Sequence, residues 1–266
     1  MTDPRGSVAF DRAAEYYDLT RGLSPDGTRK TVELLASQLD GRGDVLEVGV
    51  GTGQIALPLH DAGIPVIGLD LARPMMNKLI EKAGGRSPLP LVQADATAMP
   101  FRDDAFGGAY LRWVLHLIPA WRTTLSEIAR VVRPGGVLLT ALGAYGGPRS
   151  EIQQRFADMT GISLEPPGLT WAGYDTLDDA MVQLGFAPRD LPPFTEIERD
   201  RLDTFIDGIA NNRYSWTWKV DDPELFRRAS ADVRRWAEER YGPLHLVPPG
   251  AYESVWRAYD APEGAV

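Results

Sequence analysis

Between residues 45 and 142 the chain alternates short apolar runs with amphipathic stretches. Short apolar runs bounded by turn residues are typical of buried strands, whereas apolar positions three and four apart are typical of helices. This pattern predicts strands at 45–49, 65–69, 90–93, 107–112 and 137–142. It predicts helices at 53–62, 73–82 and about 120–131, with a short one near 114–118. Such alternation indicates a parallel sheet with helices on both faces.

The flanking regions are expected to add helices and two further strands. Helical spacing is present at 7–20, 28–39, 151–160 and 176–184. Strands are expected at 186–194 and 252–259. The stretch 195–245 between them is far longer than a hairpin turn and is mainly helical in pattern, so we interpret it as an inserted lid. The expected domains are therefore a core of residues 1–194 and 246–266, and a helical lid of residues 195–245 over a substrate site.

Three glycines at alternate positions follow the first predicted strand: Gly49, Gly51 and Gly53. Glycine lets the backbone turn sharply and approach a ligand where a Cβ would clash. Asp70 ends the second predicted strand, where an acid can accept hydrogen bonds from both ribose hydroxyls or can cap the following helix. The residues from Gly51 to Ala56 also fit the dinucleotide pattern G-x-G-x-x-G/A, so a nicotinamide cofactor is an alternative at this point.

In the frame E-x-G-x-G-x-G, the turn resembles motif I of the class I S-adenosylmethionine-dependent methyltransferases, and its small-molecule members in particular. Four further segments resemble later motifs of that family in the same order: 68–76, 93–101, 106–119 and 125–136. The resemblance implies a Rossmann-like, doubly wound α/β fold. Its seven-stranded sheet has one antiparallel strand, and the last two strands form a hairpin. This sequence departs from that pattern, since residues 195–245 place a helical insert before the last strand. The resemblance also implies S-adenosylmethionine as cofactor and S-adenosylhomocysteine as product.

The resemblance implies an adenosine site built from two acids and their neighbours. Asp70 would bind the ribose, and Leu71 and Met75 would flank the adenine by apolar contact. The Asp95 carboxylate would accept from the exocyclic amine, and the Ala96 N–H would donate to a ring nitrogen. A nicotinamide enzyme has no need of an acid at Asp95, so this residue separates the two cofactor classes.

The methionine end of the cofactor is expected on the other side of the turn. The segment Gly49–Gly53 would pass under the carboxypropyl group, with Glu47 helping to fix the amino end, although a buried Glu47 could also cap a helix. Leu111, near the end of the fourth predicted strand, would lie close to the sulfonium. The stretch from Phe10 to Arg21 resembles an N-terminal cover, so Tyr17 or Arg21 is expected to close over the methionine end.

The candidate chemistry on the acceptor side is less specific. His116 is a candidate general base, because an unperturbed imidazole pKa of about 6.5 suits proton removal near neutrality; a structural role is the alternative. Arg112 is expected to point away from the sulfonium, towards the substrate or an acid, and Trp113 lines the pocket or packs in the core.

An aromatic cluster in the expected lid, Tyr214, Trp216 and Trp218, has the alternation of an extended wall. Such a wall could line a substrate pocket. A core patch beneath the lid is the alternative reading of the same three side chains.

The amino-acid composition narrows the classes of function that remain possible. The 266 residues hold no cysteine, so neither a disulfide nor a thiolate metal site is expected, and the three histidines are too scattered to suggest another metal site. The net charge of −9 argues against a nucleic-acid substrate. No apolar run reaches the roughly 18–20 residues of a membrane span, and no signal peptide is visible, which favours a cytoplasmic protein with a small-molecule substrate and no membrane partner.

Two functions remain as alternatives to methyl transfer. A nicotinamide-dependent oxidoreductase would need a catalytic Tyr-Lys or His pair, but none of the four lysines follows a tyrosine at helical spacing. A protein that binds the cofactor on the same fold without transferring the methyl group would carry identical binding motifs. The oligomeric state is not predicted by any of these patterns.

Overall fold

The computed structural model describes residues 10–142, 147–170 and 173–264 and contains a seven-stranded sheet. Its strands are β1 Val45–Val48, β2 Val66–Asp70, β3 Leu91–Gln93, β4 Phe106–Arg112, β5 Val132–Ala141, β6 Ala187–Asp190 and β9 Trp256–Asp260. They lie in the order β3-β2-β1-β4-β5-β9-β6, and β9 is antiparallel to both β5 and β6. The predicted Rossmann-like sheet with one antiparallel strand is therefore confirmed. Its last two strands, β6 and β9, pair antiparallel, but residues 191–255 lie between them in the sequence, so they do not form a simple hairpin.

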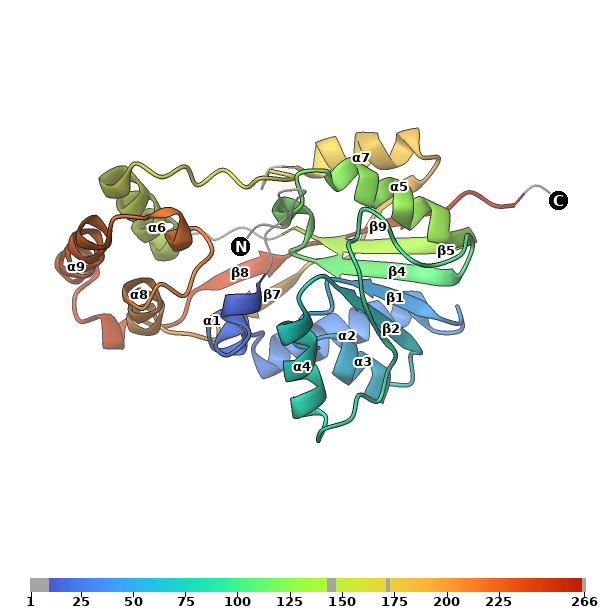
Figure 1. Cartoon of the computed structure of the whole chain (residues 1–266), viewed down its shortest axis with the longest axis horizontal. Coiled ribbons are helices and arrows are strands. Elements are labelled where there is room, and N and C mark those ends of the chain that lie inside the picture. The colour runs from blue at the N-terminus through green and yellow to red at the C-terminus, as the bar shows by residue number, and fades with distance from the viewer. Residues whose placement is uncertain (1–9, 143–146, 171–172, 265–266) are drawn as a thin grey trace.

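Helices cover both faces of this sheet, as the alternation of elements predicts (Figure 1). One face carries α2 Pro25–Leu39, α3 Ala56–Asp61 and α4 Arg73–Lys82, and the other carries α5 Trp121–Val131 and α7 Tyr174–Gln183. The side chains of β4 alternate between the two layers. Ala109 and Leu111 pack in the cluster that contains α5 and α7, whereas Tyr110 packs in the cluster that contains α2, α3 and α4. This alternation buries both faces of a central strand.

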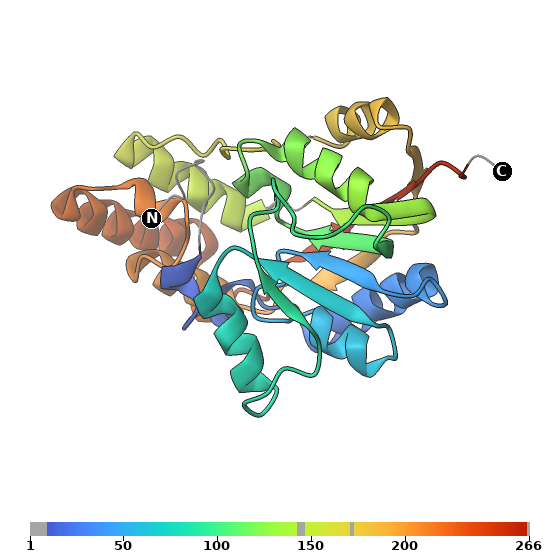
Figure 2. The ribbon, with the colours of Figure 1, turned by 45° about the vertical axis from the view of Figure 1, so that its right-hand side comes forward.

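Three helices pack together at one end of the sheet and form what we call the cap (Figures 1 and 2). They are α6 Gly147–Thr160, α8 Leu202–Ala210 and α9 Pro223–Tyr241. The cap has an apolar cluster of its own, to which Phe156, Phe205 and Val233 each contribute a fully buried side chain. Because α6 lies outside residues 195–245, the cap is assembled from two separate stretches of the chain.

A second, two-stranded sheet connects the cap to the core. Its strands are β7 Phe194–Ile197 and β8 Ala251–Ser254, which pair antiparallel with Glu196 opposite Tyr252. We call this pair the ribbon. The expectation of one strand at 186–194 and one at 252–259 is wrong. Each region forms two short strands, one in the large sheet and one in the ribbon. Pro192 and Pro193 separate the first two because proline cannot donate to a ladder. Val255 separates β8 from β9, and its carbonyl accepts a hydrogen bond from the Tyr174 hydroxyl.

The N-terminal segment also differs from the expected helix at 7–20, of which residues 7–9 lie outside the described ranges. The described part forms two short helices, η1 Asp11–Ala13 and α1 Tyr17–Arg21, separated by a turn. Ala14 packs against Ala72 and Met75 of the core, with Phe10 and Tyr17 beside them. Three more short helices, η2 Leu115–Leu117, η3 Thr217–Lys219 and η4 Leu244–Leu246, complete the element order. The stretch 195–245, expected to be mainly helical, begins inside β7 and continues with α8, η3, α9 and η4.

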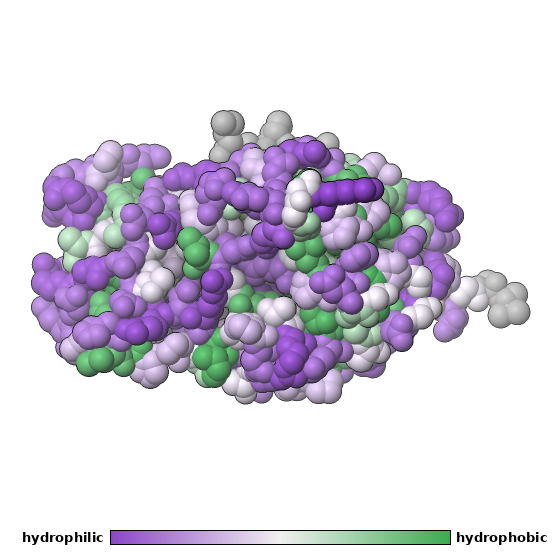
Figure 3. All heavy atoms as spheres, turned by 90° about the horizontal axis from the view of Figure 1, so that it is seen from below, coloured by the Kyte–Doolittle hydropathy of each residue, from purple (hydrophilic) through white to green (hydrophobic). Residues whose placement is uncertain are grey.

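Hydrophilic residues dominate the face of the molecule viewed from below, and apolar residues form only scattered groups on it (Figure 3). The large apolar side chains that are exposed, Leu19, Val182, Ile197 and Leu246, come from separate elements. None of the helices in the described ranges combines the length and hydropathy needed to cross a membrane.

Candidate functional site

The three glycines after β1 adopt the left-handed backbone that the sequence pattern suggests. Their φ angles are +79° at Gly49, +52° at Gly51 and +74° at Gly53. A Cβ on Gly49 or Gly53 would lie 2.5 Å from Val114 or 2.7 Å from Leu79, so these two glycines are required for packing. A Cβ on Gly51 would make only ordinary contacts, the nearest with Met75 at 3.5 Å, so Gly51 is the least crowded of the three. Gly51 also lines the pocket, where the missing Cβ leaves more room for a ligand.

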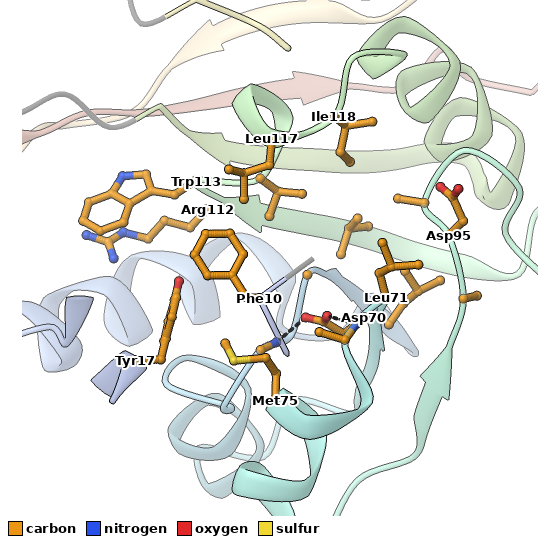
Figure 4. Close-up of a pocket in the computed structure, with 18 residues that line it drawn as sticks. Phe10, Tyr17, Asp70, Leu71, Met75, Asp95, Arg112, Trp113, Leu117 and Ile118 are labelled. Atoms are coloured by element: carbon orange, nitrogen blue, oxygen red, sulfur yellow. Dashed lines mark hydrogen bonds between the residues drawn. The ribbon is translucent and has the colours of Figure 1, made fainter. Parts of the chain in front are cut away.

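The pocket lies at the carboxyl ends of β1, β2 and β4, where ligands bind in doubly wound sheets. It is lined by Phe10, Tyr17, Val48, Gly49, Gly51, Leu69, Asp70, Leu71, Ala72, Met75, Ala94, Asp95, Ala96, Arg112, Trp113, Val114, Leu117 and Ile118. Figure 4 shows Asp95 at one end and Arg112 with Trp113 at the other, with Asp70 and Phe10 between them. Four separate motifs of the sequence are therefore brought to one elongated pocket.

Asp70 lies at the end of β2 and binds two backbone amides. Its Oδ2 accepts from the Gly51 N–H and its Oδ1 from the Ala72 N–H, both over 2.7 Å. Burial raises the pKa of this carboxyl, and the two amides oppose that rise. Each carboxylate oxygen has a second lone pair for a ligand hydroxyl. The two expected roles coexist, since Asp70 lines the pocket and also holds the residue that precedes α4.

Asp95 is fixed in the loop after β3. Its Oδ1 accepts from both the backbone N–H and the hydroxyl of Thr97 over 2.8 Å. Leu71, Met75 and Ala96, the other residues expected at an adenine, line the pocket as well. An acid, a backbone amide and apolar flanks are therefore available together at this end.

Glu47 and Leu111 are not among the residues that line the pocket and lie behind it. Leu111 is fully buried in the core. Glu47 accepts a hydrogen bond from the Tyr110 hydroxyl over 2.8 Å and another from the Ala56 N–H at the start of α3. Burial, together with the negative charge of Asp70, raises the pKa of Glu47 to about 8. In this position Glu47 joins β1 to β4 and to the start of α3.

The raised pKa of Glu47 predicts a specific pH dependence of stability. Unfolding returns the group to its ordinary pKa of 4.5, so between pH 4.5 and 8 the folded state holds the proton more strongly. The free energy of unfolding should therefore fall as pH rises from 5 to 8, by up to ~1.4 kcal/mol per pH unit from this group. Urea unfolding across that range should show a shallower slope for Glu47→Gln than for the wild type. Parallel slopes would contradict the prediction.

The N-terminal segment contributes Phe10 and Tyr17 to the pocket wall. Arg21 lies outside the pocket lining, in a box of aromatic rings. Its guanidinium carbon is 5.4 Å from the ring of Phe10, 5.7 Å from that of Tyr17 and 5.3 Å from that of Tyr214, and its Nη1 donates to the Arg213 carbonyl. Sequence reasoning did not single out Phe10, and the signal that could have done so is its place in the N-terminal cover stretch.

Arg112 and Trp113 line the end of the pocket that is far from Asp95. The Arg112 side chain is only 7% exposed and forms an ion pair with Glu196 of the ribbon, which is 2% exposed, over 3.3 Å. Its guanidinium carbon lies 3.9 Å from the centre of a Trp113 ring. Glu196 was missed from the sequence because the partner strand is 84 positions away and no local pattern connects the two.

His116 lies in η2, while the adjacent Leu117 and Ile118 contribute to the pocket wall. Its carbonyl accepts from the Gly168 N–H over 3.0 Å. Burial of the imidazole, together with the nearby positive charge of Arg21, lowers the pKa of His116 to about 3. The ring is therefore neutral throughout the physiological range but weakly basic.

The aromatic cluster of the insert takes two different positions. Tyr214 and Trp216 stack in the cap, with ring centres 5.6 Å apart and planes 10° apart. Trp218 instead approaches Phe10, with ring centres 5.5 Å apart, and its indole N–H donates to the Asn212 carbonyl. None of the three lines the pocket. The expected extended wall does not form, because the chain turns between Tyr214 and Thr217, whose N–H donates to the Tyr214 carbonyl over 2.9 Å, and continues into η3.

Comparison with known proteins agrees with this geometry. Residues 46–140 match the family described as "Methyltransferase domain". The demethylmenaquinone methyltransferase of Streptomyces avermitilis is 27% identical over 232 residues, which cover 85% of this chain and 86% of that protein. The phosphatidylethanolamine N-methyltransferase of Cereibacter sphaeroides is 32% identical over 146 residues, which cover 53% of this chain and 70% of that protein.

A solved structure agrees at the level of the fold. A putative type II methyltransferase from Anaeromyxobacter dehalogenans superposes with a TM-score of 0.62 at 20% identity, covering 89% of this chain and 97% of the other. The sequence matches, the sheet order and the pocket at the glycine turn all agree with the resemblance of the five motifs. The chain belongs to the class I S-adenosylmethionine-dependent methyltransferases.

Proposed function

We propose that this chain binds S-adenosylmethionine along the pocket from Asp95 to the glycine turn at Gly49–Gly53 and transfers its methyl group to a small molecule. The observation that carries the proposal is the arrangement of two acids, Asp70 and Asp95, on either side of Leu71 in one pocket that begins at Gly51. Ribose hydroxyls and an adenine amine are donors that suit these acids. Nicotinamide cofactors carry the same adenosine groups, and the family match is what favours S-adenosylmethionine over them.

The residues present fit the cofactor at both ends. Asp70 would hold the ribose, Leu71 and Met75 would flank the adenine, and the open side of Gly51 would admit the chain that joins the ribose to the methionine group. Tyr17 is placed to cover the methionine end. Arg21 lies beside it, and its positive charge would favour a carboxylate there.

When bound, S-adenosylmethionine supplies a methyl group on a positively charged sulfur, which already makes a good leaving group. The protein's contribution is then to align acceptor and methyl group and to exclude water. Phe10, Trp113, Leu117 and Ile118 give the pocket an apolar wall that serves both purposes. The negative net charge and the names of the relatives support a small molecule rather than a nucleic acid as acceptor.

We also propose that the cap acts as a lid on the acceptor side. Trp218 contacts Phe10 of the pocket wall, and Arg12 lies 4.7 Å from the centre of a Trp218 ring. The cap and the N-terminal segment would therefore open and close together, as covers over reacting centres commonly do.

Binding measurements test the proposed cofactor. S-Adenosylhomocysteine should bind with micromolar affinity and raise the melting temperature, because a ligand that binds only the folded state stabilises it by mass action. NAD and NADH at the same concentrations should leave the melting temperature unchanged. Calorimetry that detects NADH but not S-adenosylhomocysteine would overturn the proposal.

Replacement of His116 tests whether the reaction needs a base. An imidazole with a pKa of about 3 is a poor proton acceptor at neutral pH, so alignment alone is expected to carry the reaction. We expect His116→Ala to lower the single-turnover rate by less than about tenfold at saturating cofactor, and the wild-type rate to show no His116 titration between pH 5 and 8. A fall of about 10²–10⁴ in a fully folded variant would instead identify His116 as the base.

A further inference from the structure

The guanidinium of Arg112 is short of hydrogen-bond acceptors. Within the described ranges only its Nη2 has partners, the Glu196 carboxylate and the Tyr252 hydroxyl at 3.3 Å or more. Its Nε is buried and has no partner. A buried N–H donor without an acceptor is costly and uncommon in folded proteins, so the group indicates a missing acceptor. Its Nη1 also has no partner in the described ranges but is not fully buried, and because Arg112 lines the pocket, a ligand there is the natural source of an acceptor for Nη1.

The ribbon holds this guanidinium in place. Glu196 and Tyr252 are directly opposite each other in β7 and β8, and the Tyr252 hydroxyl donates to Glu196 Oε2 over 2.6 Å. The same carboxylate oxygen faces Arg112 Nη2. The charge of Arg112 is therefore balanced before any ligand arrives, and both partners lie outside the pocket lining.

The backbone beside Arg112 gives a second, independent observation. Trp113 has a φ of +58°, a conformation that is rare for a bulky residue and costs free energy. This conformation places the indole against the Arg112 guanidinium at the pocket wall. Strain of this kind tends to occur where it orients a functional side chain.

We propose that Arg112 and Trp113 form a recognition site for a neutral oxygen carried on a flat ring of the methyl acceptor, and that Glu196 and Tyr252 position the guanidinium for it. The proposal rests on the proposed methyl transfer and names the acceptor class. A carbonyl or hydroxyl oxygen supplies the acceptor that Nη1 lacks. A carboxylate is disfavoured because Glu196 already neutralises the cation, and the aromatic wall of Phe10 and Trp113 suits a ring.

Three probes with one ring system test the site: naphthalene, 2-naphthol and 2-naphthoate, titrated by ligand-observed NMR in saturating S-adenosylhomocysteine. The wild type should bind 2-naphthol at least about tenfold more tightly than either other probe, the effect of one hydrogen bond to a charged donor. The double variant Arg112→Met/Glu196→Gln removes the pair without leaving a buried charge, and should lose that preference while keeping its affinity for S-adenosylhomocysteine.

The single variant Glu196→Gln gives a result that a merely structural role would not produce. It leaves the cation of Arg112 without its counter-charge, so the preference should shift by about tenfold from 2-naphthol towards 2-naphthoate. The matched control is Arg155→Met, which breaks the Arg155–Asp232 ion pair of the cap, away from the pocket, and should leave the order of the probes unchanged.

Three results would overturn the recognition site while the proposed function stands. They are a preference for 2-naphthol that survives in the double variant, a wild-type preference for 2-naphthoate, and no binding of any probe to a wild type that is saturated with S-adenosylhomocysteine. Failure of the wild type to bind S-adenosylhomocysteine would instead overturn the proposed function, and this proposal with it.

Discussion

Asp70→Ala should weaken the binding of S-adenosylhomocysteine by about 10- to 150-fold, since the variant loses charge-assisted hydrogen bonds worth ~1.5–3 kcal/mol. The carboxylate of Asp70 organises the pocket as well as contacting a ligand, because it holds the amides of Gly51 and Ala72. Titration calorimetry on the folded variant measures the loss. The fold should persist, because the surrounding core packs through other side chains.

Asp222→Ala is the matched control for this prediction. Asp222 also binds two backbone amides, those of Glu224 and Leu225, but it does so at the exposed start of α9. Its removal should reduce stability by ~1 kcal/mol and leave the affinity for S-adenosylhomocysteine unchanged. Equal affinities of Asp70→Ala and the wild type would show that Asp70 is only a structural residue and that the ribose lies elsewhere.

Arg149→Met should destabilise the cap by about 3–5 kcal/mol, the usual cost of breaking a buried ion pair from one side. The Arg149 side chain is 7% exposed, its Nε lies 2.8 Å from Glu198 Oε2, and its Nη2 donates to the Asp200 carbonyl over 2.6 Å. It therefore joins α6 to the chain that leaves the ribbon. In the variant, α6, α8 and α9 should lose their protection from hydrogen exchange at a lower urea concentration than the central strands lose theirs.

Arg227→Met supplies the control for Arg149→Met. Arg227 pairs with Glu224 within α9, but the two side chains are 72% and 62% exposed, and an exposed pair of this kind contributes little to stability. Uniform loss of protection across core and cap in Arg149→Met would contradict the prediction, because it would mean that the cap and the core unfold as one unit.

The sequence predicts the core and the adenosine side of the pocket well, because both depend on local patterns. The turn at Gly49–Gly53 follows from glycines at alternate positions, and Asp70 and Asp95 each follow a short apolar run. In a parallel sheet the ends of such runs meet at one edge, so residues that are far apart in sequence can be placed together without a structure. The bounds of α4, Arg73–Lys82, coincide with the helix expected at 73–82.

The acceptor side could not be predicted in this way, because its contacts join segments without a shared local pattern. Glu196 was assigned to a helical insert, yet it pairs in a strand with Tyr252 and reaches Arg112. Tyr214 and Trp216 alternate in sequence as a strand would, but the turn that begins at Tyr214 and burial against Phe156 decide their positions. The pKa of His116 depends likewise on burial and on Arg21, which is close only in the fold.

The ribbon has a consequence for how this protein can change. The N–H of Glu198 donates to the Gly250 carbonyl over 2.8 Å, so the chain departs from the core and returns to it at nearly one point. A segment with adjacent ends can be replaced by one of a different length at little cost in loop-closure entropy. Residues 199–249, with the face of α6 on which they pack, thus form an exchangeable cassette. Chimaeras with relatives could therefore exchange the cap while they retain the pocket and the ribbon, whose residues lie outside this segment.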